Sequence, residues 1–306
     1  MSQTVLIFGA NGQVGRELQR VAWPASLTPV SLARPEGDVT RPEAIAAAVA
    51  QHNPVALVNA AAYTAVDKAE TEAEAAFAIN RDGAANLARA AAAAAVPLIH
   101  ISTDYVFDGS KPGAYAPSDP VAPLGVYGQS KEAGERAIRA AAEKHVILRT
   151  AWVFGPYGHN FVKTMLRLAA ARPELRVVAD QRGCPTPATA IADAIAQITA
   201  ALLNGSTAYG TYHFAGRAPV SWHGFAEAIF AEGQRYGWPV PKVHAITTED
   251  FPTPARRPAN SVLDCSALTA AFGIMPADWR LGLIDMLAEC RDEIGANFAA
   301  LSEEKR

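Results

Sequence analysis

The chain begins with a short apolar run that leads directly into a glycine-rich loop and then into a helical stretch. Residues 4–8, TVLIF, are followed by Gly9, Gly12 and Gly15 in the segment GANGQVGR. Glycines at a strand-to-helix turn let the backbone approach a pyrophosphate, whose charge is favoured by the free N–H groups at the helix N-terminus. The spacing is GxxGxxG instead of GxGxxG, and a bare glycine-rich turn is the alternative. With a strand before it and a helix after it, we expect a dinucleotide site.

Strand-like and helical stretches alternate through the first half of the chain. Short apolar runs lie at 4–8, 27–32, 56–60, 97–102 and 145–150, and helices are expected to begin near Gln13, Pro42, Ala65 and Pro123. Continuous apolar runs are typical of strands buried on both faces. The alternation therefore predicts an α/β fold with a Rossmann-type, doubly wound parallel sheet. Thr40-Arg41-Pro42-Glu43 has the pattern of a capping box at the start of the second helix.

After about Thr150 the pattern loosens. Further strands at 176–179 and 210–215 are expected, with helices near 160–171, 187–203, 221–236 and 279–296. We expect residues 1–150 to form an NAD(P)-binding Rossmann domain and residues 151–306 to form mainly a smaller C-terminal α/β lobe for the substrate. The chain could also cross back between the lobes. A ligand should bind in the cleft at the carboxyl ends of the strands.

Composition excludes several classes of protein. The 306 residues carry a net charge of only -3 and half are hydrophobic, so the chain can bury a large core and lacks the basic surface of a nucleic-acid binder. Three scattered cysteines, Cys184, Cys265 and Cys290, do not suit a disulfide framework or a CxxC metal site. The N-terminus lacks the basic segment of a secretory signal, and every long apolar stretch is interrupted. We therefore expect a soluble, cytoplasmic protein without nucleic-acid or membrane partners.

Residues after the second and third strands bear on the choice of cofactor. An acidic residue after the second strand would hold the ribose 2'-hydroxyl of NAD, but the chain has Arg34 there. An arginine can pair with a 2'-phosphate, so NADPH is favoured and NADH remains an option; a solvated loop charge is the alternative. Asp38 and Val39 lie where a loop could fold over the adenine, although Asp38 also suits a simple turn. Ala61 and Ala62 suit either close contact with a cofactor or tight helix packing.

Tyr127 and Lys131 lie four residues apart in VYGQSKEAGERAIRAA. That spacing places both on one helix face, where an ammonium group lowers the pKa of a phenol towards the range useful for proton transfer. A solvated helix face produces such pairs as well. Thr103 follows the fourth strand, where its hydroxyl could hydrogen-bond a carbonyl oxygen that Tyr127 protonates, or simply close a turn. Combined with the glycine loop, these three residues favour a carbonyl reductase.

The ordered segments GANGQVG, NAAAYTAVDKAE, STDYVFDG, YGQSK and RTAWVFGPYGHNF resemble those of the extended short-chain dehydrogenase/reductase superfamily. Within it, the chain is most similar to the dTDP-4-dehydrorhamnose reductase family, and DQRGCPT and ARRPANSVLDCSAL extend the resemblance over nearly the whole chain. The resemblance implies NADPH-dependent reduction of the 4-keto group of dTDP-4-dehydro-β-L-rhamnose to dTDP-β-L-rhamnose. That step belongs to dTDP-rhamnose biosynthesis for cell-surface polysaccharide.

The resemblance also implies roles for single residues. Tyr127 would donate the proton, Lys131 would hold the nicotinamide ribose, and Thr103 would polarise the carbonyl. Implied cofactor contacts are Gly12, Gln13, Val14, Asp38, Val39, Ala61, Ala62 and Tyr63, and implied sugar-nucleotide contacts are Thr103, Asp104 and Trp152. Without the family, Trp152 would suit the core equally well. We also expect Arg257 to bind the substrate diphosphate, because a guanidinium matches phosphate in a forked geometry; a surface charge is the alternative.

Two questions remain open at this point. Some similar proteins hold magnesium between subunits through glutamates, but the helix after CPTPATA offers only Asp193, and Glu17 would match a single ligand. We therefore predict no metal requirement. Competing functions are a nucleotide-sugar epimerase or dehydratase that retains NAD, a non-catalytic regulatory subunit like that of methionine adenosyltransferase, and a purely structural scaffold. The oligomeric state is not fixed, and a homodimer is compatible with the sequence.

Overall fold

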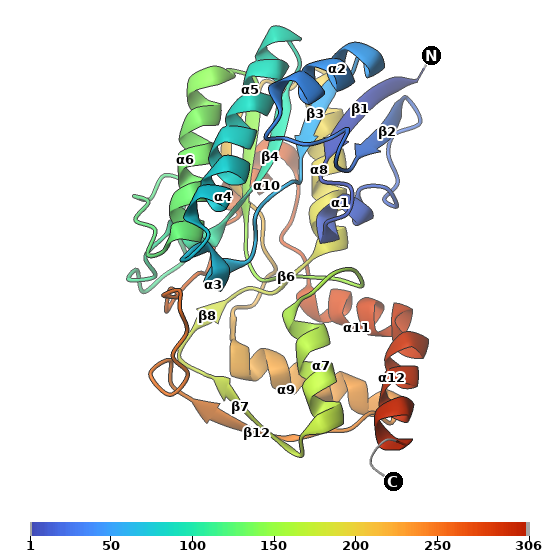
Figure 1. Ribbon diagram of the computed structural model, residues 1–306, viewed down its shortest axis with the longest axis vertical. Coiled ribbons are helices and arrows are strands. Elements are labelled where there is room, and N and C mark those ends of the chain that lie inside the picture. The colour runs from blue at the N-terminus through green and yellow to red at the C-terminus, as the bar shows by residue number, and fades with distance from the viewer. Residues whose placement is uncertain (1, 304–306) are drawn as a thin grey trace.

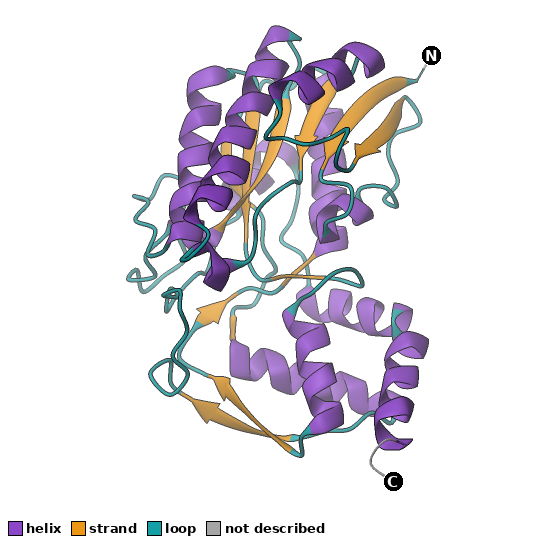
Figure 2. Cartoon of the chain, in the orientation of Figure 1, coloured by secondary structure: helices purple, strands orange, loops and turns teal. Residues whose placement is uncertain are grey.

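The computed structural model describes residues 2–303, apart from the side chains at 297 and 299–303. Residues 304–306, the last of the expected second lobe, lie outside the described residues. Figure 1 shows a larger lobe built around a sheet and a smaller, mainly helical lobe beneath it. Figure 2 shows the strands of the large sheet enclosed by helices.

A six-stranded parallel sheet forms the centre of the larger lobe, in the order β10-β5-β4-β3-β1-β2. Its strands are β1 (Gln3–Phe8), β2 (Leu27–Leu32), β3 (Ala56–Asn59), β4 (Leu98–Thr103), β5 (His145–Thr150) and β10 (Gly210–His213). The first five agree with the predicted apolar runs to within one residue at each end. The predicted doubly wound α/β fold is confirmed.

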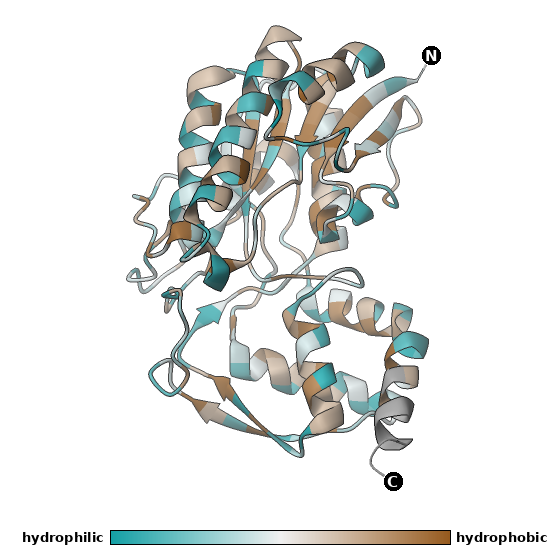
Figure 3. Cartoon of the chain, in the orientation of Figure 1, coloured by the Kyte–Doolittle hydropathy of each residue, from teal (hydrophilic) through white to brown (hydrophobic). Residues whose placement is uncertain are grey.

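Helices cover both faces of this sheet. One face carries α1 (Gln13–Glu17), α8 (Ala188–Leu203) and α10 (Ser266–Phe272), and the other carries α2 (Pro42–His52), α5 (Ala84–Ala93) and α6 (Val126–Ala141). Because side chains alternate along a strand, Val5 and Ile7 of β1 pack on the first face and Leu6 and Phe8 on the second. Figure 3 shows the resulting apolar sheet between helices with mixed surfaces.

The connection from β3 to α5 is largely helical after Ala65. It contains α3 (Val66–Ala69), α4 (Ala73–Phe77) and the π-helical turn η1 (Ala78–Gly83), while the 3-10 turn η2 (Asp104–Val106) follows β4. Asn80 in η1 donates one hydrogen bond to the carbonyl oxygen of Tyr63 and another to the hydroxyl of Ser130. These bonds hold the segment after β3 against α6. The π-helical turn therefore helps to fix the backbone at the carboxyl-end edge of the sheet.

The smaller lobe packs its helices around an aromatic core that includes Phe225 and Trp279. Its elements are β6 (Val153–Phe154), α7 (Phe161–Ala171), β7 (Glu174–Val178), β8 (Arg182–Gly183), β9 (Thr186–Pro187), β11 (Val220–Ser221), α9 (Trp222–Gly233), η3 (Gln234–Tyr236), β12 (Lys242–Ile246), α11 (Trp279–Glu289) and α12 (Arg291–Glu303). The strands form three two-stranded pairs, β7 with β12, β6 with β9 and β8 with β11.

Two elements of the second half belong to the larger lobe. Strand β10 pairs in parallel with β5, and α8 packs its apolar face on the large sheet. Apolar α8 residues such as Ile191 and Ile195 are completely buried there. The chain therefore crosses back after residue 187, so residue 150 is not a simple boundary between the lobes.

The capping box predicted at Thr40 is wrong. The N-cap of α2 is Arg41, and no side chain caps this end of the helix. The Thr40 hydroxyl instead donates to Asp38 Oδ1 at 2.7 Å, and Glu43 accepts from Arg41 Nε at 2.8 Å. Because Asp38 offers a stronger acceptor two residues away, Thr40 stabilises the preceding loop instead of the helix.

Within residues 2–303, no helix combines the length and apolarity needed to cross a membrane.

Candidate active site

A cavity of about 620 Å³ lies at the carboxyl ends of β3, β4 and β5, where a doubly wound sheet binds ligands. The glycine loop and the loop before α7 close it from the sides. The predicted residues among those that line it are Gly12, Gln13, Val14, Ala61, Ala62, Thr103, Tyr127, Lys131 and Trp152. Residues as far apart in sequence as Asn11 and Trp222 therefore converge here, as a binding site requires.

The glycine loop is tightly packed against neighbouring backbone. Gly9 has φ +98°, and a Cβ on this residue would lie 2.5 Å from the backbone nitrogen of Ala61. Likewise, a Cβ on Gly15 would lie 2.0 Å from the Gly9 carbonyl oxygen. Only glycine fits at these two positions, since any side chain would push the loop away from α1 and β3. Gly15 does not line the cavity, so its role is to allow the turn.

A second cavity of about 250 Å³ continues around the same loop and shares Asn11, Gly12 and the stretch 60–62 with the first. It contains four predicted cofactor residues that the first cavity lacks: Gly9, Arg34, Asp38 and Val39. Hydrogen bonds from the hydroxyl and the backbone N–H of Thr40, opposed by partial burial, hold the pKa of Asp38 below its usual value. The two connected cavities, with an anion-compatible helix N-terminus between them, fit an extended dinucleotide.

Tyr63 does not line either cavity. Its backbone N–H donates to Asn80 Oδ1 at 2.9 Å and its hydroxyl donates to Glu72 Oε2 at 2.7 Å. The side chain is thus directed towards α4, and the predicted cofactor contact at this position would have to come from the backbone.

Tyr127 lies in the first turn of α6 and packs edge-on against Tyr105, with ring centroids 5.5 Å apart. Burial raises the pKa of Tyr127 to about 12, a hydrogen bond with Thr103 opposes this shift, and the Asp104 carboxylate adds to it. The amine of Lys131, which we expected to lower this pKa, bonds to β4. The phenol therefore keeps its proton, the form that a proton donor requires.

The amine of Lys131 is directed into the sheet. Its Nζ lies 2.7 Å from the carbonyl oxygen of Ile101 and 3.3 Å from Nε2 of His100, both on β4. The residue is only 2% exposed. Burial lowers the pKa of Lys131 to about 8, against the influence of Glu135 one helical turn further on.

Thr103 and Asp104 form a buried pair at the end of β4. The Thr103 hydroxyl donates to Asp104 Oδ1 at 3.0 Å and accepts from the backbone N–H of Tyr105 at 3.2 Å. Burial raises the pKa of Asp104 to about 6, while hydrogen bonds with Ser261 and Thr103 oppose that shift. Thr103 lines the catalytic cavity and Asp104 lies behind it, so Asp104 orients the hydroxyl.

Trp152 has φ +48°, an unusual backbone conformation for a bulky residue. Its ring stacks on Trp222, with centroids 3.4 Å apart and planes inclined by 5°. Both rings line the cavity, and together they form an aromatic wall on its smaller-lobe side. Sequence reasoning missed Trp222, because nothing in the local pattern at the start of α9 connects it with Trp152. The strained backbone at Trp152 is consistent with a constraint imposed by function.

Arg257 does not line the catalytic cavity. Its Nη2 lies 2.8 Å from Asp67 Oδ2, and its Nη1 donates to the Thr253 hydroxyl and to the Ala255 carbonyl oxygen. Asp67 belongs to α3 of the larger lobe and also accepts from the backbone N–H of Ala255. The arginine therefore ties the loop of the smaller lobe to α3, a connection that the sequence did not indicate.

A diphosphate role for Arg257 makes a testable prediction. Arg257→Ala should raise the KM for the sugar nucleotide about tenfold with little change in kcat, because a charge-assisted hydrogen bond contributes about 1.5–3 kcal/mol. Initial rates over a range of substrate concentrations measure both constants. The matched variant Asp67→Asn keeps the guanidinium and removes its partner. If Asp67→Asn raises KM as much as Arg257→Ala, Arg257 acts only as a tie between the lobes.

Acidic side chains line a separate cavity of about 300 Å³ on the other side of α1. Glu17 and Asp193 lie there, joined by Asp285 and Glu289 of α11. Sequence reasoning missed the two α11 residues, since no motif marks them. Arg20 neutralises part of this charge, with Nη1 2.8 Å from Glu289 Oε1 and 3.6 Å from Glu17 Oε2. In the described part of the chain, no three His, Cys, Asp or Glu side chains are grouped to hold a metal ion.

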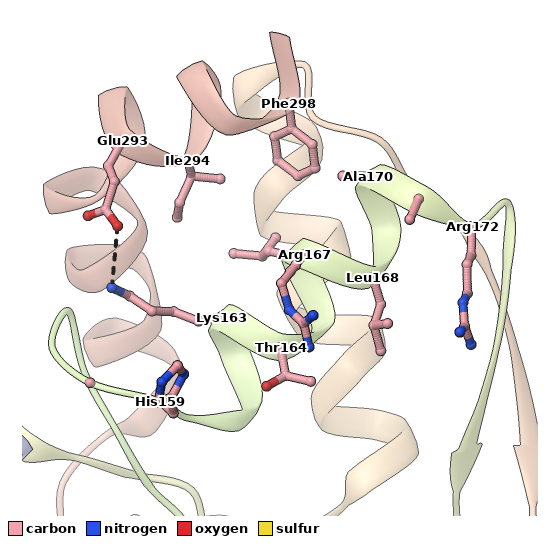
Figure 4. Close-up of a pocket in the computed structure, with 13 residues that line it drawn as sticks. His159, Lys163, Thr164, Arg167, Leu168, Ala170, Arg172, Glu293, Ile294 and Phe298 are labelled. Atoms are coloured by element: carbon pink, nitrogen blue, oxygen red, sulfur yellow. Dashed lines mark ion pairs between the residues drawn. The ribbon is translucent and has the colours of Figure 1, made fainter. Parts of the chain in front are cut away.

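A larger cavity, about 1070 Å³, lies between α7 and α12 and contains none of the reactive residues. Figure 4 shows its basic and apolar lining, with Lys163 and Glu293 paired across it at 3.6 Å. It shares only Gly158 and His159 with the catalytic cavity. We assign the chemistry to the smaller cavity, because Thr103, Tyr127 and Lys131 meet there.

The site combines a glycine loop that suits a dinucleotide with a threonine, a tyrosine and a lysine at the strand ends. This combination defines an NAD(P)H-dependent oxidoreductase of the short-chain dehydrogenase/reductase type. The model of the RmlD substrate binding domain family matches residues 3–292. The chain belongs to this family, that of the dTDP-4-dehydrorhamnose reductases.

Individual relatives agree with this assignment. The chain is 47% identical to a dTDP-4-dehydrorhamnose reductase from Aggregatibacter actinomycetemcomitans over 93% of this chain and 98% of that protein. It is 42% identical to the enzyme of that name from Escherichia coli K12, over 93% of this chain and 97% of the relative. A solved dTDP-4-dehydrorhamnose reductase from Clostridium acetobutylicum superimposes with a TM-score of 0.88 at 36% identity, covering 94% and 100% of the two chains. The Bacillus anthracis structure, in complex with NADP, has a TM-score of 0.86 at 36% identity, covering 94% and 99%.

Proposed function

We propose that this protein reduces the 4-keto group of dTDP-4-dehydro-β-L-rhamnose to the alcohol of dTDP-β-L-rhamnose with NADPH, a step in making dTDP-rhamnose for cell-surface polysaccharide. The observation that carries the proposal is the meeting of Thr103, Tyr127 and Lys131 in a cavity that continues into the glycine loop. The curated relatives named dTDP-4-dehydrorhamnose reductase support the choice of substrate. The NADP complex of the Bacillus anthracis protein supports the choice of cofactor.

The residues of the cavity suit ketone reduction. The reduced nicotinamide supplies a hydride to the carbonyl carbon. Tyr127, whose high pKa keeps it protonated, gives its proton to the carbonyl oxygen as negative charge develops there. The Thr103 hydroxyl, whose single hydrogen is donated to Asp104 Oδ1 in the structure, would turn to donate to the same oxygen when the substrate binds. Trp152 and Trp222 offer an aromatic wall for the sugar nucleotide.

Several binding residues are part of the same proposal. Gly9, Gly12, Gln13, Val14, Ala61 and Ala62 would contact the cofactor, and Lys131 would hold the nicotinamide ribose. Arg34 would pair with the 2'-phosphate, supported by its position in the cavity with Asp38 and Val39. The larger lobe, residues 1–150 with α8 and β10, would bind the cofactor, and the rest of 151–306 would bind the sugar nucleotide.

A direct assay of NADPH oxidation tests the function. The protein is incubated with the 4-keto sugar nucleotide and either NADPH or NADH, while loss of reduced-nicotinamide absorbance is followed and the product sugar is identified. We expect stoichiometric oxidation of NADPH, slower use of NADH and a 6-deoxy-L-mannose product. An epimerase or dehydratase would instead consume no NADPH and copurify with NAD, and a regulatory subunit would show no turnover.

Removing divalent metal should leave the activity unchanged. Arg20 already neutralises part of the acidic charge around the cavity at Glu17, through its contacts with Glu17 and Glu289. Burial raises the pKa of Glu17, against the opposing charge of Arg20, which further reduces the negative charge available to a cation. The measurement compares initial rates before and after EDTA dialysis. Loss of activity on dialysis and recovery with magnesium would contradict the prediction.

A cytoplasmic location and a homodimeric state are finer points of the proposal. Sedimentation velocity over a range of protein concentrations measures the second. A single monomeric species throughout would remove the homodimer from the proposal.

A further inference from the structure

Asn160, in the smaller lobe, contacts Gln13 of the glycine loop, although the two residues are 147 positions apart in the sequence. Asn160 is the N-cap of α7, where its Oδ1 accepts from the backbone N–H of Lys163 at 3.1 Å. Its Nδ2 lies 2.8 Å from the carbonyl oxygen of Gly155 and 3.0 Å from Oε1 of Gln13. One side chain therefore caps a helix of the smaller lobe and ties that lobe to the glycine loop.

The backbone neighbours of Asn160 fix which way its amide faces. A backbone N–H can only donate and a carbonyl oxygen can only accept. Lys163 therefore requires the oxygen of the Asn160 amide, and Gly155 requires its NH₂ group. With one hydrogen of Nδ2 given to Gly155, the second is directed to Gln13. Because this contact comes from a donor, the Gln13 atom that meets it must be the oxygen.

The same constraint leaves the NH₂ group of Gln13 for a ligand. Gln13 lines the catalytic cavity next to Asn11 and Gly12 of the glycine loop. Among the described residues, Gln13 Nε2 has no hydrogen-bond partner, so both of its hydrogens are available. Gly158 packs over the stem of the side chain, since a Cβ on Gly158 would lie 3.3 Å from Gln13 Cγ. Gln13 is therefore held at its stem and at its oxygen, with its donor group unused.

We propose that Asn160 is a positioning residue for the cofactor, which holds Gln13 so that Nε2 donates to the diphosphate of NADPH. This inference rests on the proposed function. Diphosphate oxygens only accept hydrogen bonds, so a Gln13 amide turned the other way would present a second acceptor to them. Gln13 directly follows Gly12 in the loop that approaches a pyrophosphate, which assigns the contact to the cofactor instead of the sugar nucleotide. Cofactor affinity then depends in part on a residue of the smaller lobe.

Asn160→Asp should reverse the Gln13 amide without removing the helix cap. Aspartate caps helices as well as asparagine does, so one of its oxygens still accepts from Lys163 N–H. Its other oxygen cannot donate, so the Gln13 amide should turn, donate Nε2 to the new carboxylate and present Oε1 to the ligand. We expect the Kd for NADPH to rise at least about tenfold, because a charge-assisted hydrogen bond is lost. Fluorescence titration of the substrate-free protein measures this Kd, and an unchanged value overturns the proposal.

A double-mutant cycle separates reorientation of Gln13 from the added negative charge. Gln13→Ala removes the amide, so in that background Asn160→Asp should raise the Kd by less than about threefold. An equal fold-change in both backgrounds overturns the proposal, because the carboxylate would then act on NADPH directly.

Asn160→Ser provides a neutral version of the same cycle. Serine keeps a cap for α7, but its shorter side chain does not reach Gln13. We expect NADPH to bind about threefold more weakly, the cost of ordering a side chain that is no longer held. In the Gln13→Ala background the serine should have no effect. A loss that persists there would mean that Asn160 acts through the fold of the smaller lobe, which overturns the proposal.

Asn260→Asp is the matched control for the asparagine variants. Asn260 has the same pattern of bonds: its Oδ1 accepts from the backbone N–H of Val262, and its Nδ2 donates to the carbonyl oxygens of Lys111 and Gly113. It lines none of the four cavities described above. This variant also loses two donated bonds and gains a charge, but its Kd for NADPH should equal that of the wild type. A loss as large as in Asn160→Asp would overturn the proposal.

Binding of dTDP identifies which diphosphate Gln13 contacts. Calorimetric titration should give the same Kd for dTDP in Asn160→Asp and in the wild type. If dTDP binding weakens as much as NADPH binding or more, the assignment to the cofactor is wrong. None of these titrations needs turnover. A protein that shows the expected NADPH pattern and fails the reductase assay would reject the proposed function and retain the inference about Asn160.

Discussion

Tyr127→Phe should lower kcat by about 10²–10⁴-fold, the contribution of a positioned proton donor, while the affinity for NADPH stays close to that of the wild type. The Tyr127 phenol lines the catalytic cavity, where burial raises its pKa and keeps it protonated beside Thr103. Phenylalanine preserves the ring and its edge-on contact with Tyr105. The loss should therefore fall on the chemical step and not on folding.

Single-turnover kinetics at saturating substrate measure that step, and fluorescence titration with NADPH measures binding. Tyr105→Phe is the matched control, because Tyr105 lines the same cavity and is packed against Tyr127. It removes a hydroxyl of the same kind that is not assigned to proton transfer, so kcat should fall by less than about tenfold. Wild-type rates in Tyr127→Phe would show that another group supplies the proton.

Local patterns were sufficient to predict the parts of this protein that depend on neighbouring residues. The apolar runs give the five sequential strands because burial on both faces demands continuous apolar sequence. The glycine loop follows from backbone sterics at Gly9 and Gly15, where no Cβ fits. Tyr127 and Lys131 share a helix face because of their spacing. Each of these inferences needs only residues within a few positions of one another.

Features that depend on distant residues could not be predicted. Strand β10 joins the large sheet through pairing with β5, more than 60 residues earlier, and nothing in its own sequence specifies that partner. Trp222 acquires its role through stacking on Trp152, and Arg257 through its ion pair with Asp67. In each case the local pattern fits a core or surface residue equally well.

The direction of the Lys131 amine could not be predicted for the same reason. Spacing correctly placed it near Tyr127, but the direction of its amine is set by β4, where His100 and the Ile101 carbonyl oxygen lie. A histidine within the apolar run PLIHIS was the one available signal, because a polar ring in a buried strand requires partners.

Arg149→Met should destabilise the protein by about 3–5 kcal/mol at neutral pH, because it removes the buried cation that is paired with a buried carboxylate. Arg149 Nη2 and Nε lie 2.6 and 2.8 Å from the two oxygens of Glu135, and these side chains are 3% and 0% exposed. Glu135 also accepts from the Ser102 hydroxyl at 2.6 Å, directly below the catalytic strand end. Urea unfolding followed by circular dichroism measures the change.

The double variant Arg149→Met/Glu135→Leu is the control for this ion pair. It removes both charges and replaces them with apolar groups, so most of the lost free energy of unfolding should return. If the single and double variants are equally destabilised, the loss comes from packing, since Arg149 also stacks over the Phe107 ring at 5.1 Å.

The pH dependence of the same variant provides a second, independent test. Burial alone would raise the pKa of Glu135, but in the wild type Arg149, Ser102 and Arg139 hold it below its usual value. Its contribution to stability is therefore present above the unfolded-state pKa, about 4.3, and is lost as the pH falls through the lower folded-state pKa.

Without Arg149, burial dominates and the folded-state pKa of Glu135 rises above the unfolded-state value. The stability difference between wild type and Arg149→Met should then be largest near neutral pH and shrink towards pH 4, because Glu135 takes up a proton in the folded variant. A difference that stays constant across this range would mean that the charge of Glu135 is not what the arginine stabilises.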